Sequence, residues 1–282
     1  MTRIAIVTDS TASLPQELVE RYHIHVIPNK VTFGSQVYQD GVDITPAEFY
    51  RMLETAPTSP TISAPMAGWI TEYYGDLMHH ADEIVSIHAS GLLSNAVGYA
   101  RSAKGTLNSP HIHVIDSQSA SMGLGLVVLA AARAAEEGED VNVVVAAAEK
   151  LVPKINIILV AETLKYLAGT MHFSKAAMAV GSVLQIKPVL CIESGLVEVL
   201  EKVRSTTKAR GQMIKAMEEK VGSGATVHAA VVHANSLAEA EAMREELAKR
   251  FDRAELCVAE LGPVIGMRTG PGAVGIAFYA EK

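Results

Sequence analysis

The sequence predicts an α/β protein of two domains: a parallel-sheet domain over residues 1–155 and an α+β domain over residues 156–282. Three observations support this fold class. The chain has 282 residues, the length of about two domains. Its residues are 49% hydrophobic and 20% charged, which is enough apolar material for a large core. Short apolar runs alternate with helical patterns, and their spacing changes after Lys154.

In the first domain, each apolar, β-branched run is followed by a helical pattern, as in parallel sheets. Three such pairs are Arg3–Thr8 with Leu14–Tyr22, Glu83–Ala89 with Leu92–Leu107, and His111–Asp116 with Met122–Gly138. Small polar residues follow the three strands, over Thr8–Ser13, His88–Gly91 and Asp116–Ser121. Ligands of parallel sheets bind at the carboxyl ends of strands, so we expect the site there.

In the second domain, the expected strands follow one another more closely, which is typical of an α+β fold. They cover residues 155–161, 183–193, 196–205, 226–234, 254–261 and 273–280. Ser194 and Gly195 separate the second strand from the third and predict a hairpin turn. Two helices are expected between the later strands, at Thr207–Val221 and Leu237–Phe251.

Charge and composition argue against several classes of protein. The formal net charge is −7 and no basic run is present, which argues against general nucleic-acid binding. The two cysteines, Cys191 and Cys257, lie in apolar runs without metal-binding spacing. The apolar stretch from Met122 is too short to span a bilayer, and no signal-peptide core precedes the first strand. We therefore expect a cytoplasmic protein with at most transient membrane contact.

Histidines near the strand ends raise the question of a metal site. His111 and His113 share one face of a strand, because side chains alternate with period two. With Asp116 as a third ligand they would suit zinc. The same residues also form an ordinary strand, and we favour that structural reading and expect no metal.

Serines near the strand ends are candidate nucleophiles, but no G-x-S-x-G elbow surrounds any of them. Hydroxyls at such places more often cap helices. We therefore expect Asp9–Ser10 and Asp116–Ser117 each to start a helix. The serines concerned are Ser10, Ser90, Ser94, Ser117 and Ser119.

The stretch Gly262–Gly275 is rich in glycine and proline and contains one charged residue, Arg268. Glycine permits positive φ and close backbone approach, whereas proline fixes φ, so we expect a close-packed loop. Within it, Arg268–Gly272 reads RTGPG, whose amides are suited to an anion-binding nest. No nucleotide-binding glycine motif accompanies it. These residues predict an oxyanion site without identifying the oxyanion.

Seven segments along the chain form a combination that is more specific than any single motif. They begin at Val7 (VTDSTASLP), Tyr22 (YHIHVIPNKVTFGSQVYQDGVDITPAEFY), Ser90 (SGLLSNAVGYARSA), Val114 (VIDSQSASMGLG), Thr163 (TLKYLAGTMHFSKAAMAVGSVLQIKPVL), Glu201 (EKVRSTTKA) and Gly262 (GPVIGMRTGPGAVG). Together they resemble the DegV family of bacterial fatty-acid-binding proteins, in the family's order and spacing. The resemblance covers nearly the whole chain.

The resemblance implies a DegV-like fold of two domains with a lipid tunnel between them. Hydroxyls and a cation at one end of the tunnel would hold the carboxylate of a long-chain fatty acid. It also implies that the protein is no enzyme and needs no cofactor. In such systems a separate fatty acid kinase brings ATP and metal and phosphorylates the bound acid, so a kinase is a candidate partner.

The resemblance places the carboxylate-binding residues, with departures from the family. The family's threonine falls on Ile62, so that hydroxyl is missing, although Thr61 and Ser63 flank the position. The family's serine is kept as Ser94, and its histidine falls on Arg268. Arginine is always charged and can grip a carboxylate through two parallel donors. We therefore expect Arg268 to replace both the histidine and the missing threonine.

Three further positions are candidate head-group or partner contacts. One family arginine falls on His172, another is kept as Arg204, and Thr269 follows the exchanged histidine. Histidine is a weaker cation than arginine near neutral pH, so this departure weakens the surface expected to face a kinase.

An alternative class remains open beside the lipid carrier. About 14 buried methylenes at about 0.8 kcal/mol each give roughly 11 kcal/mol before binding costs, enough for tight lipid binding. The alternative is an enzyme that acts on a small carboxylated or phosphorylated substrate in the same cleft. A long apolar tunnel favours the carrier, whereas a short polar cleft with a paired base favours the enzyme.

Overall fold

The computed structural model describes residues 2–162, 166, 186–222 and 224–281. It confirms the α/β class. The first sheet is parallel, in the order β2 (His25–Ile27), β1 (Ile4–Asp9), β6 (Glu83–His88) and β7 (Ile112–Asp116). Five of the six residues in β1, and five of six in β6, are buried, because helices cover both faces of this sheet.

The helices of this first part are α1 (Gln16–Arg21), α3 (Ala67–Leu77), α4 (Ala96–Leu107), α5 (Ser121–Glu136) and α6 (Val141–Leu151), with the short 3-10 helices η1 (Ser10–Ala12) and η2 (Val152–Lys154). Helices α3 and α4 pack on one face of the sheet through Ile70, Tyr74 and Ala100. Helices α5 and α6 cover the other face. Strands and helices therefore alternate in layers, as the sequence predicts.

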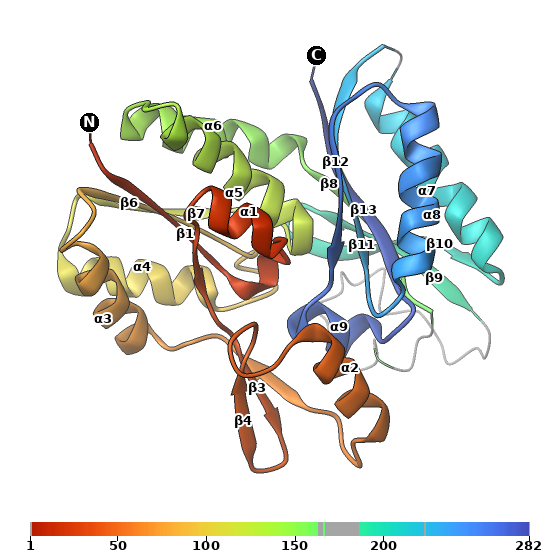
Figure 1. The fold of residues 1–282 in the computed structure, drawn as a ribbon, viewed down its shortest axis with the longest axis horizontal. Helices are drawn as coiled ribbons and strands as arrows, with labels where there is room; N and C mark the ends of the chain where they lie inside the picture. Colours follow the sequence, from red (N-terminus) through yellow and green to blue (C-terminus); the bar gives the residue numbers. More distant parts are fainter. Residues whose placement is uncertain (1, 163–165, 167–185, 223, 282) are drawn as a thin grey trace.

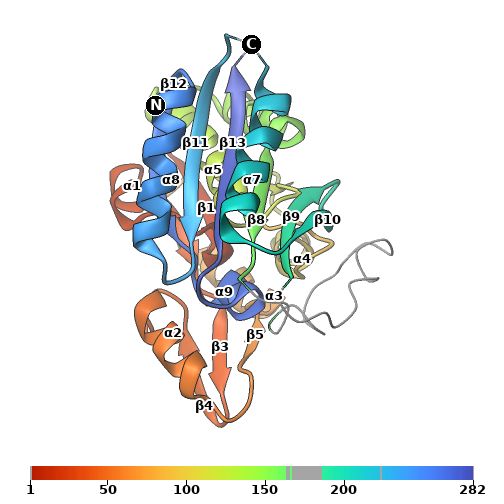
Figure 2. The same cartoon turned by 90° about the vertical axis from the view of Figure 1, so that its right-hand side faces the viewer.

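The second sheet is mixed and has the order β10, β9, β8, β13, β11 and β12. Its strands are β8 (Asn156–Val160), β9 (Lys187–Glu193), β10 (Leu196–Val203), β11 (Thr226–His233), β12 (Arg253–Glu260) and β13 (Val274–Glu281). Helices α7 (Thr206–Val221) and α8 (Leu237–Arg250) cover its outer face, as Figure 2 shows. The predicted hairpin is confirmed: Ser194 and Gly195, at φ of 49° and 81°, join β9 to β10.

Helix α5 lies between the two sheets and contacts both (Figure 1). Twelve of its sixteen residues are buried, so it is apolar on every side. A Cβ at Gly125 would lie 3.1 Å from the carbonyl oxygen of Ala12, so this glycine lets α5 approach η1 closely. The sequence MGLGLVVLAAA thus forms a helix buried between two sheets.

A small antiparallel sheet lies apart from the two larger ones, next to α2 (Pro46–Thr55), and the sequence pattern did not predict it (Figure 2). Its order is β4 (Gln36–Gln39), β3 (Lys30–Phe33) and β5 (Thr61–Ser63). These strands have three or four residues, too few for a clear alternation. Helix α2 begins at a capping box, in which Thr45 and Glu48 bond to each other's backbone N–H groups.

The prediction of a loop over Gly262–Gly275 is wrong, because helix α9 occupies Pro263–Thr269. Proline fits the first turn of a helix, where its missing N–H has no acceptor to lose. The helix ends at Gly270, whose φ of 73° favours glycine. Figure 2 shows α9 between the six-stranded sheet and the small sheet with α2.

The predicted anion nest in RTGPG is also wrong. The N–H of Gly270 donates to the carbonyl of Gly266 at 2.8 Å, and that of Gly272 donates to Ala234 at 2.7 Å. Pro271 has no N–H. These amides are therefore occupied by the protein's own backbone.

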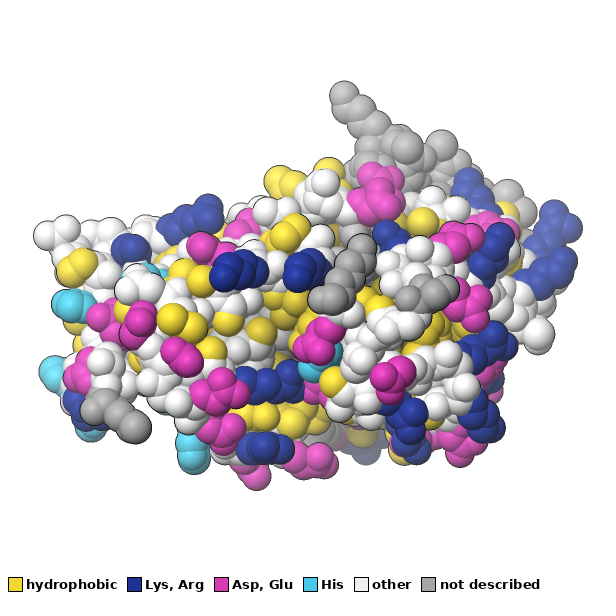
Figure 3. Space-filling view, turned by 90° about the horizontal axis from the view of Figure 1, so that it is seen from above, with side chains coloured by type: hydrophobic (Ala, Val, Ile, Leu, Met, Phe, Trp, Pro, Cys, Tyr) yellow, Lys and Arg dark blue, Asp and Glu magenta, His cyan; other side chains and the backbone are white. Residues whose placement is uncertain are grey.

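The boundary between residues 155 and 156 stays a prediction; it falls between η2 and β8. One hydrophobic cluster joins Val85 of the first sheet to Leu159 of the second, so the two parts share a core. Within the described part of the chain, no helix combines the length and hydropathy needed to cross a membrane. On the face shown in Figure 3, lysine and arginine side chains are interspersed with acidic ones rather than gathered in a stripe.

Candidate functional site

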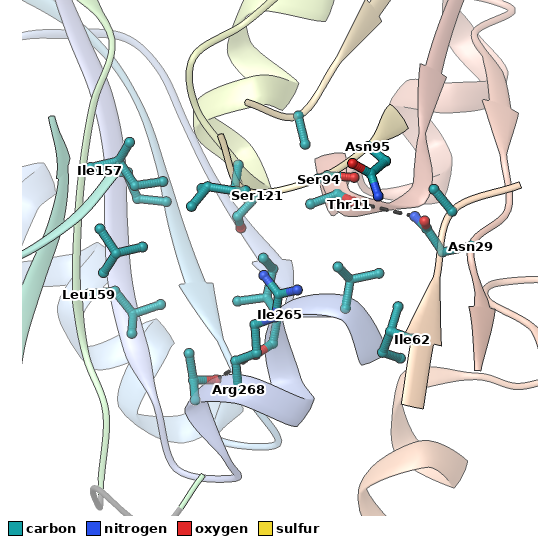
Figure 4. Close-up of a pocket in the computed structure, with 18 of the residues that line it drawn as sticks. Thr11, Asn29, Ile62, Ser94, Asn95, Ser121, Ile157, Leu159, Ile265 and Arg268 are labelled. Carbon is teal, nitrogen blue, oxygen red and sulfur yellow. Dashed lines mark hydrogen bonds between the residues drawn. The ribbon is translucent and has the colours of Figure 1, made fainter. Parts of the chain in front are cut away.

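A cavity of about 310 Å³ lies between the two main sheets. Its apolar wall comes from the second sheet, through Ile157, Leu159, Leu190, Ile192 and Val197. Because side chains alternate along a strand, the intervening residues of β8 point instead to the core beneath α7. Figure 4 shows Ile157 and Leu159 on one side of the cavity and polar side chains on the other.

Arg268 enters the cavity from α9 (Figure 4). It is the only charged residue among the described residues that line the cavity. Its Nε is buried and has no hydrogen-bond partner within the described part of the chain. Burial lowers the pKa of Arg268 from its ordinary value, but a guanidinium stays charged at neutral pH. A desolvated cation without a counter-charge favours an anionic ligand.

Contacts with α2 hold α9 in place. The hydroxyl of Tyr50 donates to the carbonyl of Leu261 at 2.6 Å, just before the helix. A Cβ at Gly266 would lie 2.4 Å from the same hydroxyl oxygen, so glycine is required there for close approach. The carboxylate of Asp40 lies against Gly262, at the start of α9. The small sheet and α2 thus position Arg268.

Ser94 and Asn95 bring the start of α4 to the cavity. The Oγ of Ser94 accepts a hydrogen bond from the N–H of Ala96 at 3.2 Å. This bond orients the oxygen and leaves its own hydrogen available for a ligand. Ser94, predicted as a carboxylate ligand, is therefore placed to donate.

Thr11 and Asn29 form a further polar edge that sequence reasoning did not assign. The side-chain amide of Asn29 donates to Ser10 Oγ at 3.0 Å and to Thr11 Oγ1 at 3.3 Å. Both Thr11 and Asn29 line the cavity. Thr11 lies in a predicted polar strand end, and Asn29 lies in the family-like segment that begins at Tyr22, where it was given no role.

Beneath Thr11, a chain of buried hydrogen bonds fixes the strand ends. Asp9 contacts His88 Nδ1 at 2.9 Å, and His88 Nε2 contacts Ser86 Oγ at 2.8 Å. Tyr74 donates to Ser86 Oγ at 2.7 Å, so the Ser86 hydrogen is directed to His88. Burial opposes ionisation of Asp9, but bonds from His88, Thr11 and a backbone amide outweigh it and hold the pKa of Asp9 below its ordinary value.

This chain has the composition of a serine–histidine–aspartate triad but lacks access to a substrate. Ser86 is 0% exposed, and His88 and Asp9 are 1% exposed each. None of the three lines the cavity. Asp9 instead accepts the N–H of Thr11 at 3.1 Å as the cap of η1, which confirms the capping interpretation of Asp9–Ser10.

Other strand-end residues also have structural partners. Asp116 starts no helix, contrary to prediction; it accepts the N–H groups of Gly91 at 3.2 Å and Gln118 at 2.9 Å, because the chain turns before α5 begins. His111 and His113 both contact Glu83, at 2.9 and 3.1 Å. In the described residues, no three histidine, cysteine or acidic side chains gather in a way suited to a metal ion.

The serine candidates serve several roles. Ser90 donates to the carbonyl of Gly195 at 2.8 Å and so joins the β9–β10 hairpin to the end of β6. Ser10 accepts from Asn29, and Ser117 and Ser119 bond within their own turn. Of the five, only Ser94 lines the cavity.

Of the remaining predicted site residues, some line the cavity and others do not. Ile62 and Ser63 of β5 line the cavity, whereas Thr61 is exposed and does not. Thr269 lines it, but its hydroxyl donates to the carbonyl of Ile265 at 3.2 Å. Exposed Arg204 follows β10 away from the cavity lining, and His172 lies outside the described residues. The ligand roles of these residues stay predictions.

The fold and the cavity define an α/β protein with an internal site between its two main sheets, which has an apolar wall and one cationic side chain. The family model described as "Uncharacterised protein, DegV family" matches residues 3–281. The chain therefore belongs to the DegV family.

Relatives and solved structures resemble the chain over its full length. A DegV domain-containing protein of Streptomyces coelicolor is 36% identical over 275 residues, 97% of each chain. A solved DegV family protein of Thermus thermophilus, described by its fatty acid binding, is 33% identical with a TM-score of 0.92 over 99% of this chain and 100% of that chain. DegV of Bacillus subtilis, described as a fatty acid binding protein, is 28% identical with a TM-score of 0.88 over all of both chains.

Proposed function

We propose that this protein binds a long-chain fatty acid, with the acyl chain along the wall of Ile157, Leu159 and Leu190 and the carboxylate at Arg268. One observation carries the proposal: the cavity combines an apolar wall with a single partly buried cation, Arg268, whose buried Nε has no partner among the described residues. Apolar burial supplies the affinity and the cation offsets the desolvation of the carboxylate. The DegV relatives described as fatty acid binding support the same ligand class.

Mass spectrometry under native conditions tests this function. Protein purified from cells should carry a mass that matches a long-chain fatty acid. After delipidation, the protein should bind a fluorescent fatty acid at one molecule per chain. A delipidated, folded protein that binds no fatty acid contradicts the proposal.

The protein is proposed to act as a carrier without catalysing a reaction on the acid. Its serine–histidine–aspartate chain is buried and away from the cavity, which supports this role over the alternative of an enzyme acting on a small carboxylated or phosphorylated substrate. A cytoplasmic location stays a prediction, which cell fractionation tests.

A separate fatty acid kinase is the proposed partner of the loaded protein. The resemblance to DegV fatty-acid carriers and the exposed cation of Arg204 support it. Mixing the loaded protein with a purified kinase, ATP and Mg²⁺ should yield an acyl phosphate, which hydroxylamine traps as a hydroxamate. No hydroxamate above the kinase-only control contradicts the partnership while leaving the carrier function intact.

A further inference from the structure

The start of α5 is a further polar feature of the cavity, and no sequence motif assigns it a role. Its first residue, Ser121, is 1% exposed and lines the cavity. The Oγ of Ser121 has no hydrogen-bond partner within the described residues. Figure 4 shows this hydroxyl directed toward the same part of the cavity as the guanidinium of Arg268. A buried, unpaired hydroxyl costs about 1–3 kcal/mol, so a ligand that pairs it is favoured.

The backbone at Ser121 is in a conformation that serine rarely adopts. Its φ is 51°, in the left-handed region that favours glycine. Such a conformation costs of order 1–3 kcal/mol and persists only where the surrounding structure imposes it. Here the chain must turn sharply from the end of β7 into α5, and the turn leaves the serine side chain facing the cavity.

The helix start also offers free backbone donors. Ala120, the N-cap residue, provides no side-chain cap. The N–H groups of Gly123 and Leu124 donate to the carbonyl of Ala120 at 3.1 and 3.4 Å. Those of Ser121 and Met122 have no acceptor within the described part of the chain. A helix of sixteen residues with unpaired N–H groups at its start attracts an anion.

Charges near this point favour an anion as well. Arg268 faces the start of α5 across the cavity (Figure 4), and no aspartate or glutamate belongs to the described cavity lining. The buried carboxylate of Asp9 lies behind Thr11, where it is held by His88. The start of α5 and the guanidinium of Arg268 therefore both contribute a positive potential to the same region of the cavity.

We propose that the N-terminus of α5, with the hydroxyl of Ser121, forms the oxyanion subsite that takes one carboxylate oxygen while Arg268 takes the other. The inference rests on the proposed fatty-acid function and extends it to the ligand's head group. A lone cation would attract any anion. Donors on two sides of the head group select an ionised carboxylate over a neutral alcohol or ester, because only the carboxylate accepts on both oxygens.

Two substitutions at one position test the subsite. Ser121→Ala removes the hydroxyl and keeps the left-handed backbone, whereas Ser121→Gly removes the hydroxyl and relieves the strain. Both should weaken binding of palmitic acid about five- to tenfold and leave binding of hexadecanol within twofold, so the acid-to-alcohol preference falls. The matched control is Ser119→Ala, since the Ser119 hydroxyl is also buried and unpaired but lies outside the cavity lining. It should leave both affinities unchanged.

The outcomes separate the subsite from the proposed function. If the wild-type protein binds palmitic acid and the Ser121 variants bind it equally well, the subsite is wrong and the carrier function stands. If the wild type binds neither ligand, the carrier function fails first. Should Ser121→Ala unfold, the strain-relieved glycine variant, monitored by thermal unfolding, still decides the matter. An equal loss for acid and alcohol also overturns the subsite, because it indicates a reshaped cavity.

Discussion

Replacing Arg268 with methionine should change stability and binding in opposite directions. Methionine keeps much of the side-chain length but removes the guanidinium, whose Nε is buried without a partner in the described residues. Leaving one buried donor unpaired costs about 1–3 kcal/mol, so the delipidated variant should gain stability of that order. The same change removes the charge-assisted bonds to the carboxylate. Affinity for a fatty acid should fall at least tenfold, or about 1.4 kcal/mol.

Two assays on delipidated protein measure these effects. Urea denaturation gives the free energy of unfolding, and titration with a fluorescent fatty acid gives the dissociation constant. The control is Arg133→Met. Arg133 is partly buried, as Arg268 is, but its Nη1 donates a hydrogen bond to Glu255 Oε1 at 3.1 Å. Arg133 lies twelve residues after Ser121 on α5, about 18 Å along the helix from the cavity end. This control should lose stability and keep its affinity.

A methionine variant that is less stable than the wild type, or that binds fatty acid within twofold of it, contradicts the assigned role of Arg268. A gain in stability without loss of affinity would mean that the cation is buried but does not hold the head group. A loss of affinity without gain in stability would mean that the guanidinium holds the head group but is also stabilised by partners in the ligand-free protein. Only a gain in stability together with a loss of affinity supports the view that Arg268 binds the ligand at a cost to the stability of the protein.

Two further predictions concern the contacts that hold α9 in place, at Gly266 and at Asp40. Gly266→Ala places a methyl group 2.4 Å from the Tyr50 hydroxyl and should lower the free energy of unfolding by about 1–3 kcal/mol, whereas Gly211→Ala, in open space on α7, should not lower it. Burial raises the pKa of Asp40 to about 6 from 3.8, so the folded chain holds a proton that the unfolded chain has released, and stability falls as pH rises through this window. Asp40→Asn should reduce the stability difference between pH 4 and pH 7.5 by about 2.4 kcal/mol in urea melts, at 1.36 kcal/mol per pKa unit, and an unchanged difference contradicts the assignment.

The local sequence patterns of the chain were sufficient to predict most strands of the two main sheets. The run that forms β1 begins with four consecutive apolar residues, Ile4–Val7, and five of the six residues in β1 and in β6 are buried, because both faces of a parallel sheet are covered. The turn at Ser194–Gly195 was recognisable because its positive φ angles restrict the residues that fit. These features depend on neighbours in sequence, so they can be recognised without knowing the tertiary contacts.

The small sheet and α9 depend on contacts between distant segments. Strands of three or four residues carry little periodicity, and the seven residues of α9 contain glycine as well as proline. Gly266 is explained only by the Tyr50 hydroxyl on α2. A loop was predicted over this stretch because glycine is common in turns, whereas Gly266 lies within a helix and is needed for close packing against Tyr50.

In the candidate site, too, some residues could be predicted from the sequence and others depend on contacts between distant segments. The family resemblance located Ser94 and Arg268, because these positions fall on carboxylate-binding residues of the family. Asn29 and Ser121 also lie in family-like segments, but no role was assigned to either until the fold placed both against one cavity. Periodicity and turn chemistry act between near neighbours and can be read along the chain. A cavity and an unpaired buried donor result from packing between segments far apart in sequence, so they exist only in the folded protein.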